Sequence, residues 1–386
     1  MSRRRLVLRG AEWLGAGVLG GAAGYALRQT PAAPPVPAGG EGVFDVRRFG
    51  ARGDGRHDDT RAVQAALDAA GEVRGTVWFP PGVFRVAGLV LPSSVSLRGQ
   101  GMGQSVLKLL DGSTADVLIT RDFARLTGRN SNGGVAGVTL ADLTLDGNRE
   151  RAPHGGYGLR RYGYRWTIQN VEVRHAAAGG IYTENGLVLA RNADGDMMED
   201  SWLNVRVHDN GGDGVLHRGP HDSRLVNLLL YANGGHGLRV EYDARRGYGG
   251  AGLMLQNFHA YWNGGFGLDC QGTVFGNLVE SESNALGGVR VAVSTCALIG
   301  LLLYSNGTAN GTRAPGLVVG TPEVAVASGY YTGLVTNNSA AQVVLAHDGG
   351  YNTGTLAVGY WVSGASFVEG TPHPTSTWAF PHASPA

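Results

Sequence analysis

The 386-residue chain contains little of several residue types, and each shortage excludes a class of protein. Only two cysteines occur, Cys270 and Cys296, which are too few for a disulfide framework and are expected to be small buried hydrophobes. The formal net charge is +1 at pH 7, so no overall field favours nucleic acid as a partner. Spacings typical of zinc fingers, metalloproteases, dinucleotide-binding folds and P-loops are missing, so no cofactor is expected from those motifs.

The sequence also contains no segment that is well suited to spanning a membrane permanently. The weakly apolar stretch from Trp13 to Leu27 is short and rich in glycine, so no stable membrane partner is expected. It follows "SRRRLVL", which resembles a twin-arginine export signal, and it precedes a Pro/Ala-rich tether. We expect residues 1–43 to be this export signal and tether, and the protein to be secreted, periplasmic or on the cell surface. An amphipathic helix and an uncleaved anchor are the alternatives.

Glycine, in contrast, is abundant. The chain has 64 glycines, roughly twice the usual frequency of ~7%. No Gly-x-y period exists, which excludes collagen, and regularly spaced glycines instead indicate tight turns between many short strands.

The segment from 44 to 110 has an ordered pattern of its own. An acidic stretch precedes "RAVQAALDAA", whose apolar residues recur at helical spacing, and "TVWFP", "VFRVAGLVL" and "SVSLRG" follow as strands. With "FGARGDGRHDDT" and "GTVWFPPGVFRV", this segment resembles the N-terminal cap of the pectate-lyase superfamily. The resemblance implies an all-β protein, a right-handed parallel β-helix with an N-terminal capping helix. Lyases, epimerases, hydrolases and phage spikes share this fold, so it does not select a function.

An internal repeat supports the same fold. One glycine ends a turn in each repeat, with spacings of 22, 34, 23, 30, 21 and 28 residues: Gly158, Gly180, Gly214, Gly237, Gly267, Gly288 and Gly316. Each is followed by an apolar residue, which predicts an aliphatic ladder inside a solenoid. We expect a single domain over 44–386, with the cap and first coils over 44–110 and the last coils and a C-terminal cover over 320–386.

Polar residues recur on the opposite side of the same strands. Since side chains alternate along a strand, positions −1, +2 and +4 from each glycine point outward. Four of these residues are candidates for catalysis: Tyr182, Glu184, Asp213 and His236. Five are candidates for binding substrate: Arg160, Arg218, Arg239, Glu241 and Asp269. Tyr182 and Glu184 belong to this cluster only if the insertion in the 34-residue repeat lies outside their strand.

This mixture of residues suits an acidic polysaccharide. Arginines can bind and neutralise the carboxylate of a uronic acid, which acidifies the proton on the adjacent C5 carbon. A tyrosine or histidine, here Tyr182 or His236, can then abstract that proton, with carboxylates orienting or assisting. Loss of the 4-linked sugar gives a lyase, and return of a proton to the opposite face gives an epimerase.

Over residues 44 to 300 the chain resembles the catalytic modules of mannuronan C5-epimerases. The matching stretches are "FGARGDGRHDDT", "GQGMGQSVLKLLDG", "LADLTLDGNRE", "VEVRHAAAGG", "VHDNGGDGV" and "YANGGHGLRV". The catalytic motif of that family is not retained: Gly179, Tyr182 and Glu184 stand where it has Tyr, Asp and His. Asp213 and His236 do match its site positions in residue type. The resemblance implies an exported enzyme acting on a uronate-containing polysaccharide.

Two alternatives remain open. "NADG", "GGDG" and "GHG" follow in the order seen in polygalacturonases, which would make the protein a glycoside hydrolase using Asp194 and Asp213. A non-catalytic glycan-binding or structural β-helix is the other. No metal is required by either, although Asp194, Asp196, Glu199 and Asp200 could gather Ca²⁺ through oxygen ligands.

Overall fold

The computed structural model describes most of the chain beyond residue 41. The described residues are 42–129, 133–186, 199–243, 248–249, 252–293, 295–308, 311–321, 328–345, 354–359, 368–369 and 377–379. All of them belong to one compact unit, Val36–Ala386. The expected export signal lies almost wholly outside them and stays a prediction. In the part that is described, no helix has the length and apolarity that a bilayer crossing needs.

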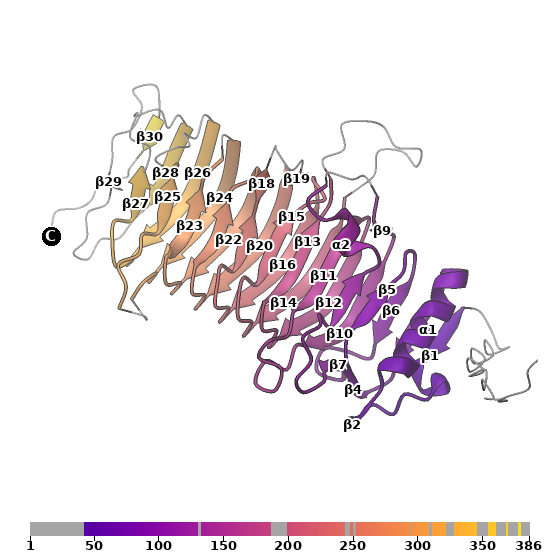
Figure 1. Ribbon diagram of the computed structural model, residues 1–386. Coiled ribbons are helices and arrows are strands. Elements are labelled where there is room, and N and C mark those ends of the chain that lie inside the picture. Colours follow the sequence, from indigo (N-terminus) through magenta and orange to yellow (C-terminus); the bar gives the residue numbers. More distant parts are fainter. Residues whose placement is uncertain are drawn as a thin grey trace, which may run out of the picture. The chain divides into compact units, whose positions relative to one another are not determined.

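Two long parallel sheets run through this unit, and the chain alternates between them (Figure 1). The path of sheet A consists of β1 (Val43–Asp45), β3 (Thr76–Phe79), β6 (Ser96–Gly99), β10 (Thr139–Asp146), β12 (Thr167–Arg174), β14 (Ser201–His208), β16 (Arg224–Tyr231), β20 (Leu253–Tyr261), β22 (Val274–Glu282), β24 (Thr295–Tyr304), β26 (Ser328–Thr336), β28 (Gly354–Gly359) and β30 (Thr377–Ala379). Sheet B consists of β5 (Leu89–Leu91), β8 (Leu118–Thr120), β11 (Tyr157–Tyr164), β13 (Gly179–Glu184), β15 (Val215–Arg218), β17 (Leu238–Val240), β21 (Phe266–Cys270), β23 (Gly287–Val291), β25 (Leu317–Val319), β27 (Val343–Leu345) and β29 (Val368–Glu369). Each coil therefore contributes one strand to each sheet, which is the predicted right-handed parallel β-helix.

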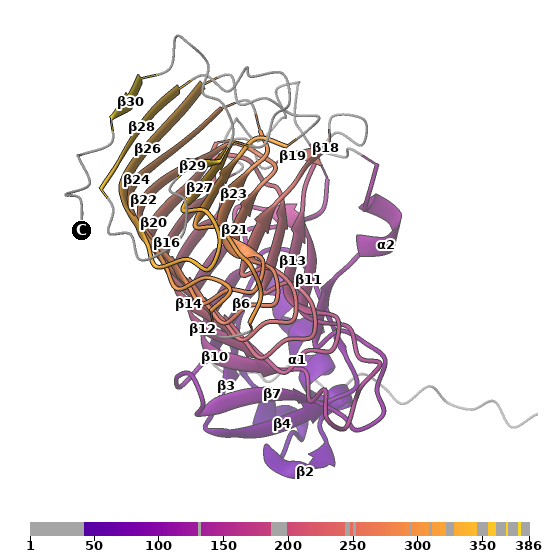
Figure 2. The same ribbon diagram turned by 90° about the vertical axis from the view of Figure 1, so that its left-hand side faces the viewer.

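The N-terminal coils carry the remaining elements. Strands β2 (Asp54–Asp58), β4 (Gly82–Val86) and β7 (Ser105–Leu109) branch from sheet A, and the short helix η1 (Val46–Phe49) follows β1. Helix α1 (Thr60–Val73) packs against β1, β3 and β5 at the N-terminal end of the sheets (Figure 1), which is the far end of the stack in the view of Figure 2. Its apolar face is fully buried, so the predicted capping helix is confirmed. Near sheet B, α2 (Phe123–Leu126) is followed by β9 (Val135–Ala136).

The aliphatic ladder is present as predicted. The residue after each turn glycine pairs with its equivalent on the next coil, and all of them are 0% exposed: Leu159, Ile181, Val215, Leu238, Leu268, Val289 and Leu317. Because neighbouring strands lie about 4.8 Å apart, each ladder side chain packs directly on the next. The hydrophobic core is therefore continuous along the stack.

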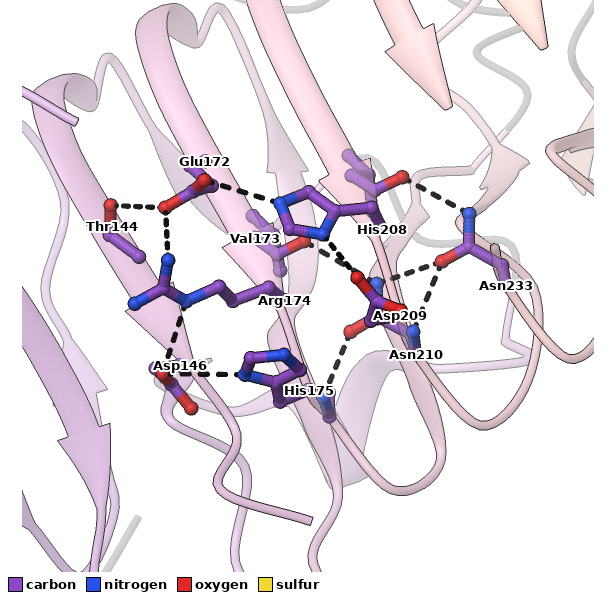
Figure 3. Close-up of polar contacts among 12 residues, drawn as sticks. Thr144, Asp146, Glu172, Val173, Arg174, His175, His208, Asp209, Asn210 and Asn233 are labelled. Atoms are coloured by element: carbon purple, nitrogen blue, oxygen red, sulfur yellow. Dashed lines mark hydrogen bonds and ion pairs between the residues drawn. The ribbon is translucent and has the colours of Figure 1, made fainter. Parts of the chain in front are cut away.

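Two columns of residues in the left-handed region shape the described coils from β12 to β24. The first bends each of these sheet A strands in the middle and includes Asn170, Asn204, Asn227 and Asn257, with φ between 51° and 56°. The second follows the strand and, from β14 onward, precedes a buried asparagine. These asparagines form a chain in which each side-chain amide donates to the next side-chain carbonyl: Asn210, Asn233, Asn263, Asn284, Asn306 and Asn338. Figure 3 shows its first link.

The irregular repeats are explained by insertions outside sheet B. Strand β13 ends at Glu184 and β14 begins at Ser201, so the extra residues of the 34-residue repeat follow Glu184. The 30-residue repeat contains a small antiparallel hairpin, β18 (Tyr242–Asp243) and β19 (Tyr248–Gly249). Neither insertion shifts the sheet B register, so Tyr182 and Glu184 remain in the predicted column.

Candidate active site

The outward columns of sheet B bring the predicted residues together. Position +2 runs through Arg160, Tyr182, Leu216, Arg239, Asp269 and Arg290 on successive strands. Position +4 runs through Tyr162, Glu184 and Arg218. The two columns are two residues apart, so arginines, carboxylates and aromatic rings share one face of β11 to β23.

Glu184 is a buried anchor at one end of this face. Its carboxylate accepts hydrogen bonds from the Thr127 hydroxyl at 2.8 Å and from the Gly128 amide at 2.5 Å, both from the loop after α2. It also accepts a hydrogen bond from the Tyr182 hydroxyl. Burial, with this bond to Glu184, raises the pKa of Tyr182 well above its usual range. Glu184 therefore orients Tyr182, whose phenol stays protonated.

Arg218 connects this anchor to the middle of the face. Its guanidinium donates to the Tyr182 hydroxyl at 2.7 Å and to the Glu241 carboxylate at 2.6 Å. Glu241 also pairs with Arg239 at 2.7 Å. Arg239 is about one third exposed, so it keeps a surface toward solvent while its other side is fixed.

In the other half of this face, the side chains of Arg290, Arg239 and His236 gather around the carboxylate of Asp269. Its side chain is 0% exposed, and it accepts two hydrogen bonds from Arg290, at 2.8 and 2.7 Å, and one from Gln271 at 3.0 Å. Arg239 lies 3.8 Å away and His236 3.7 Å away. A buried carboxylate needs such compensation, and it holds the surrounding cations in place.

His236 is held as a hydrogen-bond donor. Its Nδ1 accepts from the Phe266 backbone amide at 2.9 Å, so in the neutral ring the proton is on Nε2. Its backbone amide donates to Asp213 Oδ1 at 2.7 Å. Burial lowers the pKa of His236, although Asp269 and Asp213 oppose that shift. The ring is therefore mainly neutral at pH 7, with Nε2–H on the side of Asp269.

Tyr157 is a candidate that the sequence reasoning did not select. It pairs with Gly179 across the strands, and a Cβ added to Gly179 would lie 2.7 Å from Tyr157 Cε1. The Tyr157 ring therefore covers the position where Gly179 lacks a side chain. Arg160 lies over this ring at 4.9 Å and also pairs with Asp116 at 3.1 Å. Tyr157 is half-buried, and burial raises its pKa.

Comparison with known proteins places this chain in a family. The family model described as rhamnogalacturonase A/epimerase, pectate lyase-like, matches residues 43–259, which is more than half of the chain. The chain belongs to this pectate lyase-like family. The sequence-based resemblance to the pectate-lyase superfamily is thereby confirmed.

Individual relatives match this pectate lyase-like chain over part of its length. Mannuronan C5-epimerase AlgE4 of Azotobacter vinelandii is 36% identical over 221 residues, which are 51% of this chain and 36% of that protein. Alginate lyase 7 of the same organism is 33% identical over 220 residues, 51% of this chain and 23% of that protein. The chain thus matches only about a quarter to a third of these curated relatives. The A-module of mannuronan C-5 epimerase AlgE6 shares the fold, with a TM-score of 0.67 and 22% identity over 89% of this chain and 100% of that module.

Of the acidic stretch before β14, the structure describes only Glu199 and Asp200. Asp194 and Asp196 lie outside the described residues, so the hydrolase and calcium hypotheses that use them stay predictions. Asp200 is fully buried, pairs with Arg161 and accepts from the Trp166 amide at 2.8 Å. Among the residues that are described, no group of three or more His, Cys, Asp or Glu side chains is placed to hold a metal ion.

Proposed function

We propose that this protein modifies a uronate-containing polysaccharide by transferring a proton at C5, as an epimerase or a lyase. The observation that carries the proposal is the outward face of β11 to β23, where Arg160 lies over Tyr157 and where Arg239 and Arg290 lie with His236 around Asp269. The similarity to proteins named mannuronan C5-epimerase and alginate lyase supports this substrate class.

The arginines would bind the carboxylate. Arg160, Arg239 and Arg290 are 31%, 33% and 29% exposed, so each keeps N–H groups toward solvent while a carboxylate of the protein fixes its position. A guanidinium can bind a carboxylate bidentately, and neutralising that charge makes the adjacent C5 proton more acidic. Holding the cations before substrate arrives removes the cost of ordering them during the reaction.

Tyr157 would move the proton, and His236 would donate a hydrogen bond to the substrate. Tyr157, as its phenolate, takes the proton from C5 and leaves an enolate on the sugar, which an arginine stabilises. Nε2 of His236 already carries the ring proton while Nδ1 accepts from Phe266, so His236 serves as a hydrogen-bond donor to the substrate carboxylate and the enolate. Tyr182 supports this arrangement through its edge-to-face contact with Tyr157, with ring centroids 5.6 Å apart.

The fate of the enolate would decide the product. If the bond from C4 to the linking oxygen breaks, that oxygen receives the proton that Tyr157 took from C5, the Tyr157 phenolate is regenerated, and an unsaturated chain end forms. If C5 instead receives a proton from water on the opposite face, the sugar is epimerised, the chain remains intact, and Tyr157 loses its proton to solvent. Both outcomes begin with the same step at C5, so both depend on Tyr157.

The test uses alginate, polygalacturonate and a neutral glycan as substrates. We expect turnover of an acidic polymer by the wild type, with unsaturated ends or altered C5 configuration. Tyr157→Phe and His236→Ala should each reduce kcat/KM about 100-fold or more, whereas His259→Ala, on the outer face of sheet A, should not. Unchanged turnover in Tyr157→Phe would overturn the assignment, and new reducing ends without unsaturation would indicate a hydrolase.

A further inference from the structure

A carboxylate that has no role in the proton transfer described above lies directly beside Tyr157. Asp116 lies between β7 and β8, and its side chain is only 6% exposed. Its Oδ1 atom accepts a hydrogen bond from the Tyr157 backbone amide at 2.6 Å. The same oxygen lies 3.1 Å from Nη2 of Arg160. One buried carboxylate oxygen therefore contacts both the proposed base and the arginine beside it.

The backbone fixes the position of Asp116 relative to Tyr157. The carbonyl of Ala115 accepts a hydrogen bond from the Gly156 amide at 2.8 Å. The amide of Val117 donates to the Tyr157 carbonyl at 3.0 Å. Gly156 also makes room for the carboxylate, because a Cβ added to Gly156 would collide with Asp116 Oδ1. Asp116 lies between the two backbone bonds, so its side chain has little freedom to move away from Tyr157.

Arg160 is held over the ring of Tyr157 by this carboxylate. Its guanidinium carbon lies 4.9 Å from the centre of the Tyr157 ring and 5.7 Å from that of Phe123 on α2. A cation over an aromatic face is attracted by the ring as a whole, whereas the ion pair with Asp116 ties the guanidinium to one oxygen atom. Asp116 is therefore the contact that sets where Arg160 lies over Tyr157.

Four charged groups act on the Tyr157 phenol. Burial raises its pKa, and Arg160 has the largest effect among the charges and lowers it. Asp213 raises this pKa, Arg218 lowers it, and Asp116 raises it with the smallest effect of the four. Asp116 thus acts on the phenol in two opposite ways. Its own charge disfavours the phenolate weakly, and the arginine that it holds favours the phenolate more strongly.

Burying this carboxylate has a cost. Burial raises the pKa of Asp116, although Arg160 and the Tyr157 amide oppose that rise. A buried carboxylate needs partners that compensate for its lost hydration. Both partners belong to β11, on the face that carries the proposed reaction.

We propose that Asp116 is a positioning residue for the proton transfer, because it holds Arg160 over the Tyr157 ring, where the guanidinium stabilises the phenolate. This role rests on the proposed function, in which the Tyr157 phenolate is the base. Asp116 does not touch the substrate and acts only through Arg160. Neutralising Asp116 should therefore release Arg160 from the ring.

The experiment measures the titration of the phenol at position 157 in the free protein. The full chain carries a difluorotyrosine in place of Tyr157, because the fluorinated phenol titrates nearer to neutral pH, and fluorine NMR follows it. Asp116→Asn keeps an oxygen that can accept from the backbone amide at position 157, but it removes the charge that holds Arg160. We expect the pKa of the phenol to rise, because losing Arg160 from the ring outweighs losing the direct effect of Asp116.

Arg160→Gln separates the two effects. Alone, it should raise the pKa of the phenol, as Asp116→Asn does. In the Arg160→Gln background, Asp116→Asn should instead lower this pKa, since only the direct effect of the carboxylate remains. Asp122→Asn, which removes a charge paired with Arg125 at 3.0 Å, is the matched control and should leave the titration unchanged. A phenol pKa that falls or stays constant in the single Asp116→Asn variant would overturn the positioning role.

Activity separates a failure of this role from a failure of the proposed function. In Asp116→Asn, kcat/KM for the acidic polymer should fall about 10-fold at neutral pH and recover as the pH rises, because more phenolate then forms. If the phenol pKa rises while the pH profile stays unchanged, Asp116 still positions Arg160, and Tyr157 is refuted as the base. If the phenol pKa does not rise, the role of Asp116 is refuted even when Tyr157→Phe is inactive.

Discussion

Replacing Asp269 with asparagine should lower the pKa of His236 below its already reduced value. The Asp269 carboxylate lies 3.7 Å from His236 Nε2 and is the leading electrostatic contribution that opposes the effect of burial. At this separation a unit charge is worth between about 1 kcal/mol in water and about 4 kcal/mol near a protein surface. Since His236 is 14% exposed, a drop of roughly one pKa unit or more is expected.

The measurement is a titration of the His236 imidazole by NMR in the absence of substrate, so it does not depend on activity. Circular dichroism should confirm that Asp269→Asn is folded, and Asp209→Asn, at the end of β14 in sheet A, is the control that should leave His236 unchanged. A His236 pKa that rises or stays constant in Asp269→Asn would contradict the charge arrangement described for this face.

Three further predictions concern stability and pH. Asn233→Ala should lower the free energy of unfolding by about 3–5 kcal/mol, because the Asn233 side chain makes four buried hydrogen bonds. Asn257→Ala, on the exposed asparagine ladder, should lower it by only about 1–2 kcal/mol. Urea unfolding measures both losses, and equal losses would refute the role of the buried ladder. Burial lowers the pKa of His208, but the hydrogen bonds to Glu172 and Asp209 outweigh burial and raise this pKa overall (Figure 3). The contribution of protonated His208 to stability is therefore complete below the unfolded pKa of about 6.5 and is lost as the pH rises through the folded pKa. His208→Phe should remove that loss in urea unfolding above pH 6.5, and an identical pH dependence would refute it. Because burial raises the pKa of Tyr157, kcat/KM should increase with pH on the alkaline side if its phenolate is the base, and a decreasing profile would exclude that role.

The sequence pattern predicted the fold and the inward and outward residue columns of sheet B, because both depend on residues that are close together within one repeat. A turn glycine followed by an inward apolar residue recurs in each coil, so the ladder through Leu159 and Ile181 could be read directly. The same alternation placed Tyr182, Asp269 and Arg239 on the outer face. The N-terminal capping helix could also be predicted from the sequence, because the apolar residues of α1 recur at helical spacing and are buried as expected.

The contacts within the site could not be predicted in this way because they cross between coils. Glu184 is bound by Thr127 and Gly128, which lie 57 and 56 residues earlier in the chain. The proton position on His236 depends on a backbone amide of the next coil. The absence of a side chain at Gly179 indicated a lost catalytic group in the sequence, whereas in three dimensions Tyr157 covers that position from the preceding coil.

Deuterium transfer at C5 tests the central claim most directly. Wild-type protein and Tyr157→Phe would be incubated with alginate in deuterated water, and the polymer and any fragments would be analysed by NMR. The account predicts that the wild type incorporates deuterium at C5 or forms unsaturated ends, and that Tyr157→Phe does neither. Intact C5–H bonds in the presence of wild-type protein, with polygalacturonate giving the same result, would contradict it.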